Sequence, residues 1–275
     1  MTGAALPAGA DSVVMQEDVR EESGRVWLSV AAPGSNVRPR GEHLRQGDVV
    51  LPRQRRLRPH DVGLAATGGA AELTVYRRLR VGVLSTGDEL HDAPHVRGAA
   101  GQYDGNRPLL LASLGRAGHS AHDLGIVADR AESLERALRD AAQWQLDAVV
   151  SSGGVAQGDA DIVRRFAALD YVPLALRPGR GIAFGRVPSG ERQLWFFGLP
   201  GNSVAAYVMF QLVVAPLLGR LAGALALPPL TLRLPLAGTA RTRPGRVDWR
   251  RARLRVRDGA TEVEPLPQQS SSMLR

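Results

Sequence analysis

The sequence predicts an α/β protein whose central three-layer domain, with a mostly parallel sheet, lies between an N-terminal mostly-β module and a small C-terminal β module. Three observations predict this fold class. In residues 79–226, short apolar runs alternate with segments of helical periodicity, which is typical of a parallel sheet covered on both faces. In residues 1–78 and 227–275, short β-like runs are separated by Gly and Pro. The length of 275 residues suits two or three domains.

The N-terminal module, residues 1–78, is expected to contain short strands and one helix. The helix is predicted to begin at Pro59, because proline suits the first helical turn, and to end at the glycine pair 68–69. The predicted strands are residues 12–17, 25–30 and 48–52.

The central domain, residues 79–226, is predicted to alternate strands and helices. Its strongest helix, residues 129–145, has apolar residues at helical spacing, and Asp129 with Glu132 predicts a capping box at its start. Ligands of such sheets bind beyond the carboxyl ends of the strands. The other predicted helices are residues 106–118, 159–170 and 202–218, and the predicted strands are residues 80–87, 120–127, 146–152, 181–185 and 193–198.

The C-terminal module, residues 227–275, follows a Pro-Pro pair and is predicted to be all-β. Its predicted strands are residues 230–238, 251–256 and 261–266.

Composition excludes several classes of protein. The chain has no cysteine, which excludes a disulfide scaffold, a thiolate metal site and a cysteine nucleophile. No export signal is recognisable, and the apolar stretch 204–227 is interrupted by Gln211, Pro216 and Arg220, which favours a buried helix over a membrane span. We therefore expect a cytoplasmic protein.

The basic character of the chain comes from arginine alone. The net charge is +8, and none of the 35 basic residues is lysine. Such a surface attracts phosphate-bearing partners. The sequence shows no helix-turn-helix, zinc-finger or RNP-like pattern, so we do not expect nucleic acid to be the main partner.

Four loops of the central domain follow predicted strand ends, at residues 85–90, 101–108, 151–161 and 198–202. Glycines and small hydroxyl residues at such turns let backbone N–H groups face an anion. Carboxylates in these loops are hard oxygen ligands that suit Mg²⁺ held against phosphate. Between the third and fourth loops, Arg177 and Arg180 flank a Pro-Gly turn, and arginines bind phosphate or another oxyanion through paired N–H groups. The acids are Asp88, Glu89, Asp104, Asp159 and Asp161.

Each loop also has a structural explanation. The glycine pair 153–154 suits a tight turn, Asp159 or Asp161 suits a helix N-cap, and an exposed turn accounts for the arginine pair. The occurrence of four such loops on one sheet edge favours a phosphate-and-metal site. The histidines at 91, 95, 119 and 122 are interpreted as surface residues.

Eight ordered segments resemble the MoeA family of molybdopterin molybdenumtransferases, to which the E domain of gephyrin is related. They run from "MTGAALPAGADSVVMQE" and "RPRGEHLRQGDVVL" through "LSTGDEL", "YDGNR" and "SSGGVAQGDAD" to "RPGRGIAFG", "GLPGN" and "GRVDWRRARL". The resemblance implies a transferase that takes adenylylated molybdopterin and molybdate, uses Mg²⁺ and releases AMP. It also implies a homodimer and a molybdopterin adenylyltransferase as a partner, with no nucleic acid and no membrane.

The resemblance also implies roles for individual residues. Nucleotide and metal would be held by Asp88, Asp104, Asp159 and Asp161. Molybdate would lie near Arg177 and Arg180, which together with these acids make up the implied catalytic set. The implied pterin- or phosphate-binding residues are Thr86, Gly87, Asn106, Ser152, Gly153, Gly154, Pro200, Gly201, Asn202, Ser203 and Arg251.

The chain departs from the family pattern at the expected molybdate site. The usual Lys-Pro-Gly-Lys-Pro reads Arg-Pro-Gly-Arg-Gly at residues 177–181, and arginine keeps the charge of lysine but not its shape. A serine expected near molybdate is Ala205, although Ser203 lies two positions earlier. Compared with the family, both ends of the chain are expected to be truncated.

Two alternatives to an active transferase stay open. The departures and the expected truncation favour a degenerate paralogue, or a fragment, that binds pterin or a partner without catalysis. An adenylyltransferase or a related nucleotide-binding α/β enzyme is the other alternative, and the flanking β modules argue against it.

Overall fold

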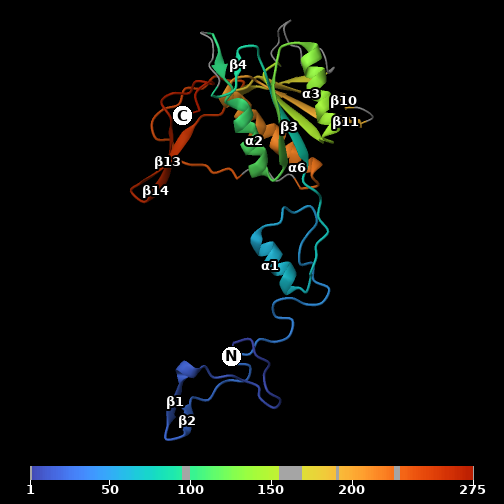
Figure 1. The fold of residues 1–275 in the computed structure, drawn as a ribbon. Helices are drawn as coiled ribbons and strands as arrows, with labels where there is room; N and C mark the ends of the chain where they lie inside the picture. The colour runs from blue at the N-terminus through green and yellow to red at the C-terminus, as the bar shows by residue number, and fades with distance from the viewer. Residues whose placement is uncertain (1, 95–99, 155–168, 190–191, 226–229, 275) are drawn as a thin grey trace. The chain divides into compact units, whose positions relative to one another are not determined.

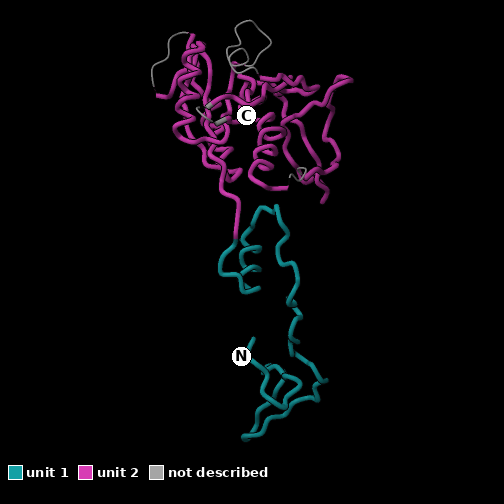
Figure 2. Tube along the Cα trace, turned by 90° about the vertical axis from the view of Figure 1, so that its right-hand side faces the viewer, with its two compact units in different colours: residues 1–73 teal, residues 74–275 magenta. Residues whose placement is uncertain are grey.

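A computed structural model describes residues 2–94, 100–154, 169–189, 192–225 and 230–274. The chain divides into two compact units, Met1–Leu73 and Thr74–Arg275, which Figure 2 distinguishes by colour. The second unit contains both the central domain and the C-terminal module that the sequence predicts. The predicted boundary between those two parts, near residue 226, falls outside the described residues.

The first unit has a hairpin, a short helix and long irregular segments (Figure 1). The predicted helix is confirmed as α1, which begins at proline and is followed by Gly68. The Asp61 carboxylate accepts the Arg58 backbone N–H at 2.9 Å, which caps the first turn. The regular elements are η1 (Gln16–Asp18), β1 (Val19–Glu22), β2 (Arg25–Leu28) and α1 (Pro59–Thr67).

Two strands predicted in the first unit are wrong. Residues 12–17 form irregular chain that enters the 3-10 turn η1, and residues 48–52 are irregular with a bend at 50–51. An apolar β-like run becomes a strand only when a neighbouring strand satisfies its backbone groups, and neither segment pairs with a strand among the described residues. The Val13 backbone instead bonds to Ser35 and to the Asn36 side chain. The run at 25–30 is a strand over Arg25–Leu28, where β1 pairs with it.

The second unit is built on a six-stranded sheet with the order β6-β3-β7-β11-β10-β8. The pairs β6-β3, β3-β7 and β7-β11 are parallel, whereas β11-β10 and β10-β8 are antiparallel. The predicted mostly parallel α/β fold is therefore confirmed. The strands are β3 (Arg80–Thr86), β6 (Ser120–Val127), β7 (Ala148–Ser152), β8 (Asp170–Pro173), β10 (Gly181–Ser189) and β11 (Arg192–Leu199).

Helices cover both faces of this sheet, so the predicted three layers are present (Figure 1). Alternate residues of one strand enter different cores, because successive side chains point to opposite faces. In β7, Val149 packs in the cluster that contains α3, and Val150 packs in the cluster that contains α2 and α6. The helices are α2 (Asn106–Ala117), α3 (Ala131–Gln143), α5 (Ser203–Met209) and α6 (Ala215–Leu221), with the π-helical turn η2 (Phe210–Val214) between the last two.

The capping box predicted for α3 is wrong. The N-cap residue is Arg130, which makes no side-chain cap hydrogen bond. Asp129 lies outside the helix, and its backbone N–H donates to the Asp88 carboxylate at 3.2 Å. The predicted helix 159–170 lies mostly outside the described residues, and its last residue, Asp170, begins β8.

The segment Ser203–Leu221 has the length and mean hydropathy, 1.7, of a membrane-spanning helix. A buried core helix passes the same test, and this segment contributes to the sheet's core. Its core residues include Ala206, Met209, Phe210, Val214 and Leu218, each of which is fully buried. The packing agrees with the buried helix expected from the interrupting polar residues.

The C-terminal part returns to the sheet domain through one short pairing. β12 (Val247–Asp248) pairs in parallel with β9 (Leu176–Arg177), while β13 (Ala252–Arg257) and β14 (Ala260–Pro265) form a hairpin. The strand predicted at 230–238 is wrong, because within its described residues only an isolated bridge from Leu236 to Val263 forms. A small parallel pair, β4 (Leu90–His91) with β5 (Gln102–Tyr103), lies before α2.

Candidate functional site

The loops singled out in the sequence meet at one edge of the sheet. The parallel strands β3, β7 and β11 have their carboxyl ends at this edge, at Thr86, Ser152 and Leu199. The antiparallel strand β10 begins at the same edge, because its Ala183 pairs with Gly198. The arginine-containing turn that precedes β10 is therefore brought to the ends of the other strands.

A cavity of about 1520 Å³ opens at this edge. Residues predicted from the sequence form part of its lining, namely Thr86, Gly87, Gly153, Gly154, Arg177, Arg180, Pro200, Gly201 and Asn202. Other predicted residues are described but do not line it, namely Asp88, Asp104, Asn106, Ser152, Ser203 and Arg251. Asp159 and Asp161 lie outside the described residues.

The turn after β7 requires glycine for two reasons. Gly153 and Gly154 have φ values of +91° and +67°, which favour glycine. A Cβ atom at Gly153 would also lie 2.7 Å from the carbonyl oxygen of Thr86, so β3 and this turn approach too closely for a side chain. The Gly153 N–H donates to the Leu199 carbonyl at 3.0 Å. The three strand ends are thus held in mutual contact around the cavity.

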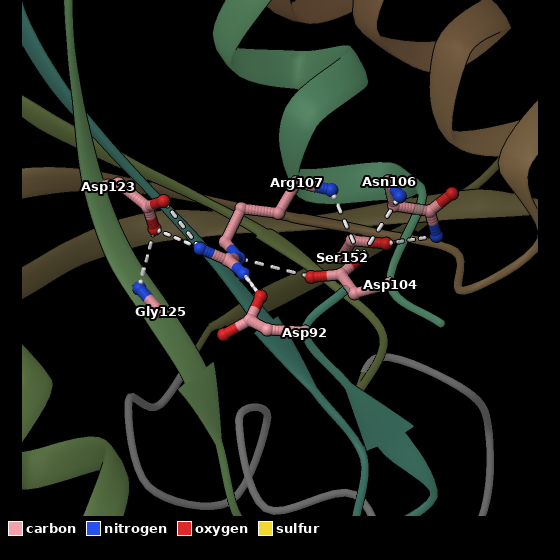
Figure 3. Close-up of polar contacts among 7 residues, drawn as sticks. All are labelled: Asp92, Asp104, Asn106, Arg107, Asp123, Gly125 and Ser152. Atoms are coloured by element: carbon pink, nitrogen blue, oxygen red, sulfur yellow. Dashed lines mark hydrogen bonds and ion pairs between the residues drawn. The ribbon is translucent and has the colours of Figure 1, made fainter. Parts of the chain in front are cut away.

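Asn106 joins the turn after β7 to the turn before α5, and Figure 3 shows its contact with Ser152. Its Nδ2 donates to the Ser152 hydroxyl and to the Gly201 carbonyl, both at 2.6 Å. The side chain therefore fixes the turn after β7 relative to the turn that begins α5. The geometry gives Asn106 and Ser152 a positioning role, and direct ligand contact for either stays a prediction.

Asp104 has its carboxylate occupied by protein groups. One oxygen accepts the backbone N–H groups of Asn106 and Arg107, at 3.0 and 3.2 Å, and the other accepts Arg107 Nε at 3.1 Å. These contacts cap α2 and leave the side chain only 1% exposed. In this conformation Asp104 is a helix cap and ion-pair partner, and its predicted metal role stays a prediction.

Arg107 is surrounded by carboxylates and is itself 8% exposed (Figure 3). Besides Asp104, its guanidinium contacts Asp92 and Asp123. Burial alone would lower the pKa of Arg107, but the hydrogen bonds to Asp123 and Asp104 and the nearby negative charges raise it above its usual value. The charged guanidinium therefore holds the loop after β4, the start of α2 and strand β6 together.

Carboxylates lie at one side of the cavity, where Glu89 and Asp129 line it. Burial raises the pKa of Asp129, and the charges of Asp88 and Glu89 raise it further. A bound cation would offset this repulsion. Among the described residues, which omit 155–168, no group of three or more acids or histidines is arranged to hold a metal ion.

Arginines line another part of the cavity and come from two parts of the chain. Arg177 and Arg180 precede β10, whereas Arg243, Arg246 and Arg250 flank β12. The β9-β12 pairing places the second group beside the first. A cavity with carboxylates in one region and guanidinium groups in another suits an anionic ligand accompanied by a cation.

Arg251 hydrogen-bonds to the last residues of the chain and does not itself line the cavity. Its guanidinium donates to the carbonyls of Gln268, at 2.8 Å, and Ser270, at 3.2 Å, and also contacts the carbonyl of Met273. Residues 269–271 line the cavity, and the Ser271 carbonyl accepts the Val204 N–H at 3.0 Å. Arg251 therefore positions a lining segment, and its predicted ligand contact stays a prediction.

The position where the family pattern expects serine is part of the cavity wall. Ala205 lines the cavity and is 3% exposed, whereas Ser203 lies outside the lining. The Ser203 hydroxyl therefore does not take the place of the serine side chain expected at position 205.

Several buried polar atoms at this edge lack hydrogen-bond partners within the described part of the chain. They are the hydroxyls of Ser85, Thr86 and Ser151 and the Oδ1 atom of Asn106. Unpaired buried polar groups are uncommon in proteins and are often found where function requires them. Thr86 lines the cavity, and Ser85, Ser151 and Asn106 lie at or beside the same strand ends, which supports the interpretation of this edge as the functional site.

Sequence reasoning missed part of the lining. Asp129 is predicted as part of a capping box, and the residues around β12 are predicted only as part of the segment "GRVDWRRARL" of the family resemblance, in which Arg251 alone has an implied role. The available signal was the alternation of Arg246, Asp248 and Arg250, which is the period of a strand with one charged face. The missed lining residues include Asp129, Tyr171, Arg243, Arg246, Asp248, Trp249, Arg250, Ser270 and Ser271.

The fold and the cavity define an α/β protein with a cavity lined by arginines and carboxylates at the carboxyl edge of a mostly parallel sheet. Two family models match the chain. The MoeA N-terminal region (domain I and II) matches residues 1–69, and the probable molybdopterin binding domain matches residues 82–220.

Curated proteins named molybdopterin molybdenumtransferase match the chain. The chain is 40% identical over 229 residues to a molybdopterin molybdenumtransferase from Haemophilus influenzae, covering 81% of this chain and 55% of the relative. It is 34% identical over 284 residues to one from Synechococcus elongatus, covering 100% of this chain and 68% of the relative. The chain thus spans about half to two thirds of the length of these relatives.

Solved structures agree with this relationship. A molybdopterin biosynthesis MoeA protein from Pyrococcus horikoshii is 29% identical with a TM-score of 0.63, over 80% of this chain and 55% of that one. A second MoeA structure from the same organism, at 22% identity, supports the fold alone with a TM-score of 0.75, over 99% of this chain and 66% of that one. The chain belongs to the MoeA family of molybdopterin molybdenumtransferases.

Proposed function

We propose that this protein inserts molybdenum into molybdopterin, using adenylylated molybdopterin and molybdate and releasing AMP. The observation that carries the proposal is the cavity in which the turns after β3, β7 and β11 meet Arg177 and Arg180. The names of the relatives supply the substrate class, and the cavity supplies groups of the right chemistry. A double anion such as molybdate lies beside a phosphate only if nearby cations and N–H groups offset the repulsion.

The glycine turns are assigned to the phosphate groups of the substrate. Gly153 and Gly154 present backbone to the cavity without side chains, which allows close approach of a large anion. Asn106 holds the turn after β7 in place through Ser152. These groups bind and orient the substrate before bond cleavage, and orientation is itself a large part of phosphoryl-transfer catalysis.

The arginine turn is assigned to the oxyanion that the reaction consumes. Arg177 and Arg180 line the cavity on either side of a Pro-Gly turn. Arginine offers two parallel N–H donors to a tetrahedral oxyanion, so the change from lysine preserves charge and adds donors. Ala205 in the cavity wall removes one hydroxyl donor, which the arginines are proposed to replace.

A divalent cation, taken to be Mg²⁺, is assigned to the acidic side of the cavity. The supporting observations are that Glu89 and Asp129 line this side of the cavity and that the pKa of Asp129 is raised, first by burial and then by the charges of Asp88 and Glu89, whose repulsion a cation relieves. Asp88 is the described member of the predicted metal-binding set that faces this group, and Asp159 and Asp161 lie outside the described residues. When bound, the cation would neutralise charge on the phosphate groups.

The direct test measures AMP release from adenylylated molybdopterin in the presence of molybdate and Mg²⁺. We expect molybdate-dependent release, which is lost in Arg180→Ala and requires a higher Mg²⁺ concentration in Asp88→Asn, because a carboxylate ligand is removed. Arg139→Ala, on the exposed surface of α3, is the matched control for loss of an arginine. Release that is absent from the wild-type chain, or unaffected by omitting molybdate, would contradict the proposal.

The second candidate function is binding without catalysis. The observation that favours it is Ala205 in the cavity wall where the family pattern expects serine. Calorimetry distinguishes the two functions, because a binding protein takes up molybdopterin with no molybdate-dependent AMP release. If this hydroxyl is the only group that the site lacks for catalysis, Ala205→Ser is expected to raise molybdate-dependent AMP release.

The remaining assignments follow the proposed reaction. A molybdopterin adenylyltransferase would supply the adenylylated substrate, and a homodimer would be the active form. The cytoplasm is the proposed location, because the apolar helix packs in the core of a folded domain. Gel filtration with light scattering tests the dimer, and a monomeric mass would contradict it.

A further inference from the structure

Charged residues alternate along the strand that brings the C-terminal part to the cavity. Arg246, Asp248 and Arg250 are separated by one residue each, which places them on one face of an extended segment. All three line the cavity. The proposed reaction described above gives none of them a role.

Asp248 contacts both arginines while remaining almost completely buried. Its side chain is 5% exposed, and one oxygen accepts Arg246 Nε at 2.9 Å. Its other oxygen lies 3.6 Å from an Arg250 terminal nitrogen. The arginines are 28% and 27% exposed, and Arg250 also contacts the carbonyl of Arg241. The carboxylate thus holds two guanidinium groups that still reach solvent.

The backbone around Asp248 is fixed by strand pairing. The Val247 N–H donates to the Ala175 carbonyl at 2.8 Å, and the Trp249 N–H donates to the Arg177 carbonyl at 2.7 Å. In the register of this parallel pair, Asp248 lies beside Arg177. Arg246 and Arg250, which flank β12, are therefore placed next to the arginine turn that precedes β10.

We propose that Asp248 is a positioning residue that holds Arg246 and Arg250 as a two-arginine clamp for a phosphate ester of the substrate. The identity of that ester rests on the proposed function. Two neighbouring guanidinium groups repel each other, and a buried carboxylate between them offsets this repulsion and fixes their directions. Each guanidinium has five N–H donors, so donors remain for a ligand after the contacts with Asp248.

The direction in which Asp248→Ala changes the affinity for anions distinguishes a positioning role of Asp248 from simple neutralisation of positive charge. If Asp248 only reduced the positive charge, Asp248→Ala would tighten the binding of anions, because a negative charge leaves the cavity. If Asp248 positions the clamp, the same change weakens binding, because the guanidinium groups lose their fixed orientation.

The test is calorimetry on the full chain with AMP as the phosphate-ester probe, and with adenosine and molybdate as comparison probes. We expect Asp248→Ala to weaken AMP binding about tenfold, the value of one charge-assisted hydrogen bond. Asp248→Glu should restore most of the affinity, since the carboxylate is kept. Binding of adenosine and molybdate should change less than twofold.

A double-mutant cycle tests whether Asp248 acts through the arginines. In a chain that already carries Arg246→Ala and Arg250→Ala, Asp248→Ala should cause no further loss of AMP affinity. Glu264→Ala removes another carboxylate–arginine pair of the C-terminal part, with Arg255 at 2.6 Å, and should leave AMP binding unchanged. Far-UV circular dichroism and thermal melting of each variant check that the fold is retained.

Four results would overturn the proposal. They are tighter or unchanged AMP binding in Asp248→Ala, equal losses for AMP and molybdate, a loss that persists in the double-arginine background, and no AMP binding by the wild-type chain. Failure of the proposed function is distinguishable, because it is read from molybdate-dependent AMP release. If the chain binds AMP in an Asp248-dependent way but does not release AMP from adenylylated molybdopterin, the clamp proposal stands and the transferase proposal is contradicted.

Discussion

At the scale of single residues, Gly153 shows how the site depends on missing side-chain atoms. Its φ of +91° and the 2.7 Å approach of Thr86 both disfavour a Cβ atom. We expect Gly153→Ala to lower the free energy of unfolding by about 1–3 kcal/mol. Gly115→Ala, in α2 where an added Cβ meets nothing within 4 Å, should instead raise it by up to about 1 kcal/mol.

Urea titration measures both glycine variants under one set of conditions. A Gly153→Ala protein as stable as the wild type would show that the turn relaxes without cost. In that case the close approach of β3 and the turn after β7 would not explain why glycine occupies this position.

Arg107 provides the opposite case, a residue whose side chain is indispensable. Arg107→Met leaves Asp104, which is 1% exposed, without its buried cation, and we expect a loss of about 3 kcal/mol in the free energy of unfolding. Arg139→Met removes an exposed arginine whose pair with Glu135 spans 3.6 Å, and should change stability by less than about 0.5 kcal/mol. Equal losses in the two variants, measured by urea unfolding, would contradict the buried ion-pair account.

At the scale of elements, the start of α1 is expected to respond to pH through Asp61. Burial alone would raise the pKa of this carboxyl, but the Arg58 backbone N–H and the charge of Arg55 lower it below its ordinary value. A carboxyl with a lowered folded-state pKa stabilises the fold above the unfolded-state pKa, about 3.9, and this stabilisation is lost as pH falls further. We therefore expect α1 to lose protection from amide hydrogen exchange below about pH 4.

The control for α1 is Asp61→Asn, which should show weaker protection at neutral pH and little further change on acidification. Asp258→Asn, at a side chain that is 95% exposed, should behave like the wild type. If amide protection of α1 were constant between pH 7 and pH 3, the carboxylate cap would not stabilise this helix.

Elements with local signals were predictable from the sequence, and elements made by distant contacts were not. The alternation of strands and helices from Arg80 onward, the start of α1 at Pro59 and the convergence of the strand-end turns all follow from periodicity and turn chemistry. The β9-β12 pairing joins short strands about 70 residues apart, and the alternation of Arg246, Asp248 and Arg250 predicts an extended segment but not the strand with which it pairs. The place of these arginines beside the cavity could not be predicted for that reason.

The predicted strands at 12–17 and 48–52 failed for a related reason. Their composition favours strands, but a strand also needs a partner strand, and none pairs with either segment among the described residues. At the site, the ligand roles of Asp104 and Arg251 were implied by motif position. The structure shows the protein contacts that these side chains also make, which a motif does not record.

At the scale of the whole molecule, the two compact units differ in how much they bury. In the described chain, Asp61 and Ala65 are the buried residues of the first unit, whereas the hydrophobic core clusters lie in the second. Burial of apolar surface is the main term that offsets the entropy of ordering a chain. The first unit therefore has much less buried apolar surface to oppose local opening. Residues 74–275, by contrast, have a hydrophobic core of their own.

We expect limited proteolysis of the full chain to cleave first within residues 2–73 and to leave a resistant product that begins near Thr74. Mass spectrometry of a time course identifies the first cuts. The fragment 74–275 should then unfold cooperatively in urea, while the fragment 1–73 should show narrow amide dispersion by NMR, since its buried apolar area is too small to stabilise a fold. A resistant product that retains residues 2–73, or a well-dispersed spectrum for the isolated first unit, would show that this unit has a source of stability other than its own core.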